Sequence, residues 1–427
     1  MLFNLSIVGT SIRTVSLGEL CLEEPNYGTS ATSIDRTDDS QPKYIRITDF
    51  DDFGIEKNHK YVTAESYASK HILQANDILF ARTGGTVGKT YFYDGSIGDA
   101  VFAGYCIRFR FDESKVVPKF IYWYTKTDMY QKWVNGIQRP VGQPNINKEE
   151  YKSFEIVLPP IDIQRKLVNF MDDANMSRQG KINQSETLLS SMNEYIFDRL
   201  NLSNIGFEER LCCAIRLANI IDDRTFSAQY YHPERMAALH LLKSNTEISA
   251  HKLSNVVTFH RDTVSSENSA NYLGLAGVES QTGELSGVQE EAAGQAFAYE
   301  KDDILYGRLR PYLNKVLLAE SDGICSTEFH VMRVIDTTTV LPEYVAAILR
   351  SDLILSQTRH MMTGNTHPRI SNDDVQNLYI PVPDISVQMQ IVDDLRKRRI
   401  EARGLKRQAE QEWQAAKKQF EKELLGE

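Results

Sequence analysis

Residues 146–168, INKEEYKSFEIVLPPIDIQRKLV, decide the fold of this chain, because their pattern returns 224 residues later. The two stretches share residues at one constant spacing, namely Ile146, Pro159, Gln164 and Val168 with Ile370, Pro383, Gln388 and Val392. In both copies a proline-bounded strand, 154–160 or 378–383, leads into a long helical pattern. Self-similarity at so long a period is typical of a duplicated domain rather than of a solenoid. The sequence therefore predicts two copies of one folded unit.

The same spacing continues along two helical patterns of about forty residues each. Apolar residues step by three and four along both, at Leu167, Met171, Ala174, Leu189, Met192 and Ile196 in the first and at Ala402, Leu405, Ala409, Trp413, Ala416 and Phe420 in the second. A helix of that length is about 60 Å long and cannot bury its whole stripe against a small domain. We therefore expect the two helices to pair antiparallel as a coiled coil, with a pseudo-two-fold axis and one α/β domain on either side.

Polar residues interrupt the first stripe around Gly180, at Arg178, Lys181 and Ser185. Gly180 has its counterpart in Gly404, and a glycine inside a helix costs about 1 kcal/mol relative to alanine. The recurrence predicts a kink or a close helix crossing at the same height in both helices.

Each unit has the pattern of an α/β domain, with its elements in the same order. In the first unit, alternation and turn residues predict strands at 44–50, 76–80, 91–93 and 103–111, an aromatic helix from Pro118 through residue 134, and a polar loop at 136–147. The second unit repeats this order, with strands at 272–279, 303–306 and 328–334, a helix at 342–357 and a polar loop at 361–371. The predicted domains are a first globular domain at 1–163, a long helix at 164–203, a linker and second domain at 204–387, and a C-terminal long helix at 388–427.

The composition is that of a soluble globular protein of two or three domains, with 427 residues and a formal net charge of −10. No apolar run reaches the roughly twenty residues that span a membrane, and the N-terminus has no basic segment or cleavage site of a secretory signal. We expect a cytoplasmic protein. The cysteines, Cys21, Cys106, Cys212, Cys213 and Cys325, form no C-x-x-C pair, which favours reduced thiols over zinc ligands or disulfides.

Residues 83–90, TGGTVGKT, resemble a phosphate-binding P-loop. The motif requires a glycine where Thr83 stands, and the residues that follow indicate a strand instead of the helix that cradles phosphate. The second copy, LRPYLNKV at 309–316, keeps the lysine and loses every glycine. We interpret the segment as a β-hairpin that offers Arg82 and Lys89 to a partner. A P-loop enzyme remains an alternative, which ATP hydrolysis by the chain alone would support.

No other catalytic constellation is present in the sequence. The chain lacks the Asn/Asp-Pro-Pro-aromatic tetrapeptide with which amino-methyltransferases hold a flipped base, and it lacks a glycine-rich cofactor loop opening a βα unit. Pro383-Asp384 has no downstream acidic-x-Lys of a nuclease, and His, Ser and Asp show no triad spacing. We interpret the chain as non-catalytic and expect no cofactor or metal of its own.

Polar side chains suited to nucleic acid gather at equivalent places in the two units. Arginine pairs with guanine, and asparagine or glutamine with adenine, while cationic groups also bind phosphate. The candidates of the first unit are Arg82, Thr83, Lys89, Gln138, Arg139, Gln143 and Asn145. The candidates of the second unit are Arg308, Arg310, Tyr312, Lys315, Asn365, His367 and Arg369. For any single residue an ordinary polar surface loop is the simpler interpretation, but the recurrence favours the loops as a class.

Two similar domains on paired helices have the geometry of a two-fold DNA reader, in which the half-site spacing follows the protein's own dyad. The halves have diverged, with TGGTVG in the first facing LRPYLN in the second, so each would read a different half-site. The alternative from geometry alone is a scaffold whose helices only hold subunits together.

The chain resembles the specificity (S) subunit of type I restriction–modification systems over nearly its whole length. In the first half the resemblance rests on YIRITDFDDFG (44–54), NDILFARTGGTVGK (76–89) and NINKEEYKSFEIVLPPIDIQRKLV (145–168). In the second half it rests on FSAQYYHPERM (226–236), DDILYGRLRPYLNKV (302–316), GICSTEFHV (323–331) and IPVPDISVQMQIV (380–392). These motifs are specific together and not singly. The first unit departs from the second because it lacks the AQYYHP opening.

The resemblance implies two target-recognition domains and two long antiparallel helices, in a subunit that is itself inert. It implies that the chain reads double-stranded DNA, docks two methyltransferase subunits, and joins motor-nuclease subunits in a complex that methylates adenine or cuts unmodified DNA. S-adenosylmethionine, ATP and magnesium would belong to those partners. The alternatives are the same role beside a fused cutting and methylating subunit, and a coiled-coil scaffold without sequence-specific DNA binding.

The acidic net charge of −10 opposes a protein that coats nucleic acid by itself. If methyltransferase subunits close around the duplex, the recognition subunit does not have to supply the whole positive channel. We therefore expect the partners to carry much of the phosphate binding.

Overall fold

The computed structural model describes residues 13–55, 59–137, 144–209, 214–223, 226–265, 271–292, 294–364 and 366–426. The chain divides into two compact units, Met1–Ile182 with Lys406–Glu427, and Asn183–Leu405. Each unit contains part of both long helices, α4 (Ile161–Arg199) and α10 (Ile385–Leu425). Because the units divide within these helices, the domain boundaries at 163, 203 and 387 stay a prediction.

The first unit is built on an antiparallel four-stranded sheet in the order β2-β9-β6-β7. The strands of this unit are β1 (Thr14–Ser16), β2 (Asn26–Tyr27), β3 (Ser33–Asp35), β4 (Lys43–Ile45), β5 (Val62–Ala64), β6 (Asp77–Ala81), β7 (Thr90–Tyr93), β8 (Ala100–Phe102), β9 (Cys106–Phe109) and β10 (Glu155–Val157). β1 pairs antiparallel with β10, β3 pairs antiparallel with β5, and β4 pairs parallel with β8. Every residue of β6 and β9 is buried, which explains their nearly continuous apolar sequences.

The predicted aromatic helix of the first unit is two helices, α1 (Pro118–Tyr124) and α2 (Asp128–Ile137). The break lies at residues 125–127, where the Thr125 and Thr127 hydroxyls each donate to a backbone carbonyl three residues earlier, at 2.7 Å. Such side-chain hydrogen bonds compete with the continuing helix. A short helix, α3 (Lys148–Lys152), precedes β10 and begins at a capping box formed by Asn147 and Glu150.

The second unit repeats this plan. Its strands are β11 (Ser249–Lys252), β12 (Val257–His260), β13 (Thr263–Ser265), β14 (Tyr272–Leu273), β15 (Gln295–Tyr299), β16 (Ile304–Gly307), β17 (Val316–Leu318), β18 (Gly323–Ser326), β19 (Phe329–Val334) and β20 (Tyr379–Val382). The core sheet has the order β12-β19-β16-β17, which corresponds strand for strand to β2-β9-β6-β7. β14 pairs parallel with β18, as β4 does with β8, and β11 closes on β20 as β1 does on β10.

The helices of the second unit follow the same order, with an added N-terminal pair. They are α5 (Leu217–Asp223), α6 (Pro233–Ser244), α7 (Pro342–Arg350), α8 (Asp352–Thr358) and α9 (Asn372–Gln376). The single helix predicted at 342–357 is divided at Ser351, whose hydroxyl donates to the Ile348 carbonyl at 2.6 Å. This break is the counterpart of the break between α1 and α2.

Two buried glutamines confirm the duplication at the level of single hydrogen bonds. In the first unit the Val117 N–H donates to Gln164 Oε1 at 2.8 Å, and in the second the Leu341 N–H donates to Gln388 Oε1 at 3.0 Å. Each glutamine amide also donates to a proline carbonyl at the start of its long helix, at 2.8 Å in both units. Gln164 and Gln388, which occupy equivalent positions in the two copies, therefore attach each long helix to its own domain.

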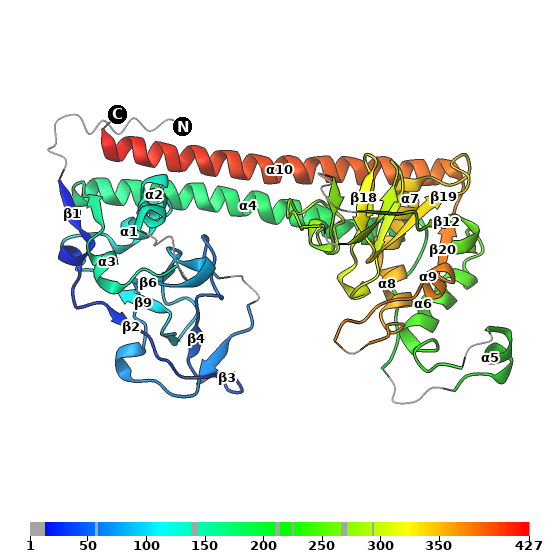
Figure 1. Ribbon diagram of the computed structural model, residues 1–427, viewed down its shortest axis with the longest axis horizontal. Helices are drawn as coiled ribbons and strands as arrows, with labels where there is room; N and C mark the ends of the chain where they lie inside the picture. Colours follow the sequence, from blue (N-terminus) through cyan, green and yellow to red (C-terminus); the bar gives the residue numbers. More distant parts are fainter. Residues whose placement is uncertain are drawn as a thin grey trace. The chain divides into compact units, whose positions relative to one another are not determined.

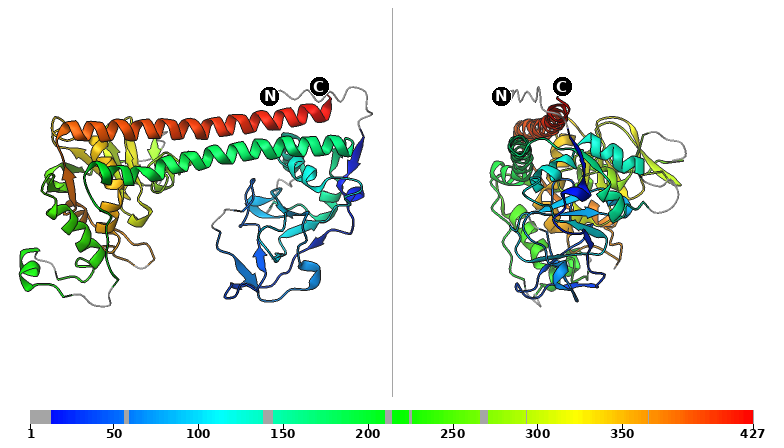
Figure 2. Two further views of the ribbon diagram at one scale, coloured as in Figure 1. Left: turned by 180° about the vertical axis from the view of Figure 1, so that it is seen from behind. Right: turned by 90° about the vertical axis from the view of Figure 1, so that its left-hand side faces the viewer.

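Within each unit α4 and α10 lie side by side and run antiparallel (Figures 1 and 2). In the first unit Met171 and Phe420 share one core, and Lys181 Nζ pairs with Glu412 at 2.7 Å. In the second unit the Ser185 hydroxyl donates to the Ala402 carbonyl at 3.0 Å, and the Tyr195 hydroxyl donates to Asp394. In both, the α10 partner number falls as the α4 number rises. The prediction of an antiparallel helix pair is confirmed.

The expectation of a close helix crossing at Gly180 and Gly404 is wrong, and so is the expectation that Ser185 interrupts the apolar stripe. A kink at the two glycines stays a prediction. A Cβ at either glycine would meet no atom within 4 Å, so neither marks a close crossing, and both helices continue through these positions. Ser185 does not interrupt the seam, because it is fully buried and its small side chain bonds to α10. The predicted apolar stripe is otherwise buried or half-buried.

Other expectations changed in detail. The strand predicted at 44–50 is limited to β4, because Asp49 accepts the Arg46 N–H at 2.9 Å and closes a turn. Cys21, Cys106 and Cys325 are free thiols, as the spacing predicted, and Cys212 and Cys213 lie outside the described residues. Among the helices in the described ranges, none is long and apolar enough to cross a membrane.

Candidate nucleic-acid interface

The hairpin of the first unit, residues 82–89 between β6 and β7, rests on two buried tyrosines. The Tyr151 hydroxyl donates to the Ala81 carbonyl at 2.8 Å, and the Tyr130 hydroxyl donates to the Gly88 carbonyl at 2.9 Å. Gly88 has a φ of +86°, and a Cβ there would lie 2.7 Å from a buried valine side chain. The base of the hairpin is therefore held by the core, and this position requires glycine.

The hairpin meets the second predicted segment, the loop before α3. The Ile146 N–H donates to the Arg82 carbonyl at 2.8 Å, and the Gly84 N–H donates to the Pro144 carbonyl at 3.1 Å. The side chains add to this pairing, since Arg82 Nε donates to Asn145 Oδ1 at 3.3 Å and the Arg82 guanidinium lies 4.8 Å from the ring centre of Tyr27. The structure thus brings hairpin and loop together as one surface.

The second unit forms the same surface from corresponding residues. The Ile370 N–H donates to the Arg308 carbonyl at 3.1 Å, and the Arg310 N–H donates to the Pro368 carbonyl at 2.7 Å. Leu309 pairs with Arg369 as Thr83 pairs with Asn145. The backbone framework is therefore repeated, although few of its side chains are.

The left-handed backbone of the hairpin is repeated even where glycine is lost. Gly84 and Gly88 have φ values of +74° and +86°, and their counterparts Arg310 and Asn314 have values of +49° and +53°. A side chain in this conformation costs about 1–2 kcal/mol. Asn314 offsets that cost, because its amide donates to the Arg350 carbonyl at 2.7 Å. Arg310 is exposed and makes no such side-chain bond within the described residues, and uncompensated strain of this kind concentrates at functional sites.

Several candidates of the second unit bond to the protein itself. Arg308 donates to the Thr327 carbonyl at 3.2 Å, and Arg369 forms an ion pair with Glu328 at 2.6 Å, which raises the pKa of Arg369. Lys315 Nζ donates to the Leu275 carbonyl at 2.7 Å, and partial burial lowers the pKa of Lys315. These three residues position the loops, and their role as DNA contacts stays a prediction.

The other candidates divide by exposure. Arg310, Tyr312 and His367 are exposed on the hairpin and loop of the second unit, while Thr83 and Lys89 are half-buried in the first. The Thr83 hydroxyl donates to the Pro144 carbonyl at 3.3 Å. The remaining candidates, Gln138, Arg139, Gln143 and Asn365, lie outside the described residues.

The hairpin and loop of each unit lie within residues that match a known protein family. Residues 12–186 and 272–409 match the family described as the type I restriction modification DNA specificity domain. The two matched ranges cover most of the chain and include both long helices in part. The chain belongs to this specificity-domain family.

Curated specificity subunits match shorter stretches of this specificity-domain protein. The specificity subunit of the type I restriction enzyme EcoDI from Escherichia coli is 28% identical over 120 residues, which cover 27% of this chain and 26% of that one. The StySPI specificity subunit from Salmonella potsdam is 26% identical over 132 residues, covering 29% and 28%. The matched stretches thus span little more than a quarter of these relatives.

A solved structure supports the fold over nearly the whole length. It comes from work described as the structural basis of complex assembly and conformational transition of the type I R-M system. The similarity has a TM-score of 0.51 at 14% identity and covers 97% of this chain and 96% of that one. At this identity the similarity concerns the fold alone.

Tyr105 is a candidate of this specificity-domain protein that the sequence analysis missed. It is 62% exposed, and its carbonyl accepts the Arg82 N–H at 3.0 Å, so its backbone lies next to the hairpin of the first surface. The sequence predicts a strand at 103–111 that includes Tyr105, whereas in the structure residues 103–105 form the turn between β8 and β9. Gly104 was the signal that was available for this turn.

The P-loop interpretation is wrong because a strand, and not a helix, follows the segment. Residues 84–86 form a short 3-10 helix and Thr90 begins β7, so no helix N-terminus is present there to bind phosphate. The β-hairpin is confirmed by the antiparallel pairing of β6 with β7, and the contact of Arg82 and Lys89 with a partner stays a prediction.

One cluster in the second unit contains ligand types suited to a metal ion. His232, Glu234 and His360 place ligand atoms within 4.8 Å of one another. The imidazole rings are stacked, with centres 3.4 Å apart and an angle of 17° between their planes, so their nitrogen lone pairs lie in two nearly parallel planes and do not meet at one point. The buried Glu234 carboxylate already accepts from Ser356 at 3.1 Å and pairs with Arg359 at 2.5 Å. The cluster therefore anchors the opening segment of the second unit to α8.

A buried histidine beneath the second surface predicts a pH effect on stability. Burial and the nearby Arg308 lower the pKa of His330 to about 3. In the unfolded chain its pKa is about 6.5, so the unfolded state binds more protons between these values and stability is lost as the pH falls below 6.5. At pH 5 the loss from His330 is about 2 kcal/mol at 1.36 kcal/mol per pH unit. We expect His330→Ile, which introduces the residue of the equivalent position Ile107, to remove that part of the loss.

The measurement compares the unfolding free energies of the parent chain and of His330→Ile at pH 7 and at pH 5. Unfolding is followed by circular dichroism. The exposed His367 gives the matched control, because His367→Gln should leave the difference between the two pH values as in the parent chain. An equal loss in the parent chain and in His330→Ile would contradict the assignment.

Proposed function

We propose that this chain is the non-catalytic DNA sequence-recognition subunit of a type I restriction–modification complex. Each unit reads one part of an asymmetric, two-part DNA site. The observation that carries the proposal is the pair of surfaces with one backbone framework and different side chains. A constant framework with divergent loops is how a scaffold changes specificity while it keeps its fold.

The two surfaces offer different chemistry to DNA. In the first unit, Arg82 is held by Asn145 and Tyr27, and its N–H donates to the carbonyl of the exposed Tyr105. In the second unit, Arg310 is exposed next to Tyr312. An arginine fixed by neighbours loses little entropy on pairing with a guanine edge, whereas a free arginine adapts to base or phosphate. We therefore assign Arg82 to base reading and Arg310 to base or phosphate contact.

The proposed partners are two methyltransferase subunits, which bind S-adenosylmethionine, and motor-nuclease subunits, which bind ATP and magnesium. The complex acts on cellular DNA in the cytoplasm. Because the chain has a net charge of −10, its partners supply much of the positive charge around the duplex. The chain alone should therefore show a shallow dependence of DNA affinity on salt, and the chain with its methyltransferase a steep one. A steep dependence for the chain alone would count against this division of charge.

Mapping of methylated adenines tests the central proposal. The chain is produced with its methyltransferase subunit in a host without other adenine methylation, and the modified positions are read across the genome. We expect one motif with two specified parts and a spacer of constant length. Methylation or binding without any sequence preference would favour the coiled-coil scaffold instead.

The strained Arg310 allows recognition to be separated from stability. We expect Arg310→Gly to weaken DNA binding by the chain with its methyltransferase about fivefold or more, because a base or phosphate contact of about 1–3 kcal/mol is lost. Its unfolding free energy should stay the same or rise by up to about 1 kcal/mol, because glycine relieves the left-handed strain as Gly84 does in the first unit.

The matched control is Lys301→Ala, which removes an exposed cation just before β16, at the end of the strand away from the hairpin. Titration of labelled duplex carrying the mapped motif measures affinity, and urea unfolding measures stability. Unchanged affinity in Arg310→Gly, or an equal loss in Lys301→Ala, would remove Arg310 from the interface.

A further inference from the structure

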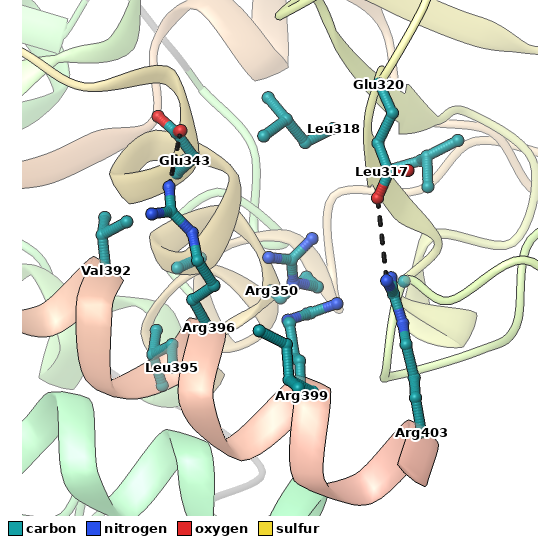
Figure 3. A pocket seen from close by; sticks show the side chains of 13 residues that line it. Leu317, Leu318, Glu320, Glu343, Arg350, Val392, Leu395, Arg396, Arg399 and Arg403 are labelled. Carbon is teal, nitrogen blue, oxygen red and sulfur yellow. Dashed lines mark hydrogen bonds and ion pairs between the residues drawn. The ribbon is translucent and has the colours of Figure 1, made fainter. Parts of the chain in front are cut away.

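A pocket of about 170 Å³ lies in the second unit between α7, β17 and α10. Its wall combines apolar residues, including Ala347 and Leu317, with arginines that extend into it from two helices. Figure 3 shows Arg350 and Arg399 next to each other near the centre of the pocket. Such a concentration of guanidinium groups in a partly apolar cavity requires negative charge to balance it.

The carboxylates around the pocket balance all but one of these arginines. Arg396 pairs with Glu343 at 3.3 Å, Arg399 pairs with Glu284 at 2.5 Å, and Arg403 pairs with Glu284 and, at 3.7 Å, with Glu320. The fourth guanidinium, on Arg350, forms no ion pair in the part of the chain that the structure describes. The carboxylate that acts on it is Glu284, which is already shared by Arg399 and Arg403.

Arg350 is held in this position by the backbone. Its Nη1 donates to the Val316 carbonyl at 3.0 Å, and Gly283 packs so closely that a Cβ there would lie 2.9 Å from Arg350 Nη1. Burial and the neighbouring Arg399 lower the pKa of Arg350 well below its ordinary value. Since arginine stays charged in proteins, the pocket keeps an unbalanced positive charge with guanidinium hydrogens left to donate.

The first unit shows the same position without a comparable set of arginines. Lys126 is the counterpart of Arg350, and its Nζ donates to the Thr90 carbonyl at 3.1 Å, just as Arg350 bonds to β17. Trp123 stands where the second unit has Ala347, and its indole donates to Asp172 at 2.9 Å. Both units thus have a cation at this position, while the second unit has a methyl group where the first has a large aromatic side chain.

We propose that this pocket binds a phosphate-type oxyanion, either free or as the terminal phosphate group of a small molecule. A water molecule takes about 30 Å³ of liquid volume, so the cavity holds an ion several times larger. Planar guanidinium groups donate in pairs to the oxygens of phosphate. Arginines approaching from α7 and α10 offer more donors than the two oxygens of a carboxylate can accept. The bound ion would relieve the repulsion between Arg350 and Arg399 and tie α10 to α7 and β17.

The test uses the full chain and three probes, namely inorganic phosphate, pyrophosphate and ADP, against sodium chloride at equal ionic strength. We expect a saturable rise in melting temperature and a saturable heat of binding with at least one phosphate probe. A stronger response to ADP than to pyrophosphate would identify a nucleotide as the source of the phosphate group. The absence of a saturable response to all three would overturn the proposal.

Two variants locate the binding in the pocket. Ala347→Trp fills it with the side chain of the first unit, and Arg350→Met removes the unbalanced charge; each should reduce the affinity for the effective probe at least tenfold. The comparison is between phosphate and chloride for each variant, so a change in basal stability does not affect it. Arg398→Gln is the matched control, because Arg398 lies on the same helix but bonds to Ser191 at 2.7 Å. Wild-type binding in both pocket variants would overturn the assignment to this pocket.

Discussion

Exchange of residues 226–388 for the equivalent segment of a relative is expected to change one part of the recognised DNA sequence and to leave the other part unchanged. The segment carries the second hairpin, the loop at 366–369, and the whole sheet β12-β19-β16-β17 beneath them. Their core is formed largely within the segment, around residues such as Ile304, Met332 and Tyr344. The surface and its support therefore move together, which is the condition under which a graft keeps its geometry.

Two residues of the exchanged segment, Gln388 and Glu284, decide which related protein can supply the replacement. Gln388 bonds to the backbone just before α7, so the donor must keep glutamine there. Glu284 pairs with Arg399 and Arg403 of the retained helix, so the donor must keep a carboxylate at that position. A donor without it would leave the largely buried guanidinium group of Arg399 unpaired, at a cost of several kcal/mol.

The readout is the map of methylated adenines for the parent and the exchanged chain, each with the same methyltransferase. The reciprocal exchange of residues 1–163 serves as the control and should change the other part of the motif. If either exchange alters both parts, the units do not read DNA independently and the modular interpretation is wrong.

Phe420→Ala is expected to lower the unfolding free energy of the first unit by about 3–5 kcal/mol, the range for truncation of a fully buried phenylalanine. Phe420 lies on α10, is fully buried, and its ring centre is 5.8 Å from that of Phe120. On the same face, Trp413 lies 5.7 Å from Trp123. The aromatic groups of α10 therefore complete a core whose facing residues, Phe120 and Trp123, lie some 300 residues earlier in the chain.

Tryptophan fluorescence gives this measurement a clean signal. The three tryptophans of the chain, Trp123, Trp133 and Trp413, all belong to the first unit. Urea titration followed by their emission should show a lower midpoint for Phe420→Ala. Met389→Ala is the control on the same helix, because Met389 is 54% exposed and its truncation should change stability by less than about 0.5 kcal/mol. Equal midpoints for Phe420→Ala and the parent would mean that α10 does not complete this core.

The sequence by itself determined the duplication, the long helices and the location of the candidate surfaces. These follow from local patterns: the shared residues around Gln164 and Gln388, the apolar stripe that ends in Phe420, and the strand pair DILF and DILY before each hairpin. Hydrophobic periodicity and turn-forming residues depend on only a few neighbouring positions, so they can be recognised in a single sequence. The same patterns missed the breaks at Thr125 and Ser351, because hydroxyl groups there bond to the helix backbone instead of to solvent.

Only the tertiary structure decided what each polar side chain of the surfaces is free to do. Arg369 is bound to Glu328, 41 residues away, and Lys315 to Leu275, 40 residues away, whereas Arg310 is exposed in a strained conformation. The pocket around Arg350 likewise arises where α7, β17 and α10 meet. Hydrogen bonds and ion pairs of this kind depend on which distant residues the packing brings within about 3 Å, and no local pattern carries that information.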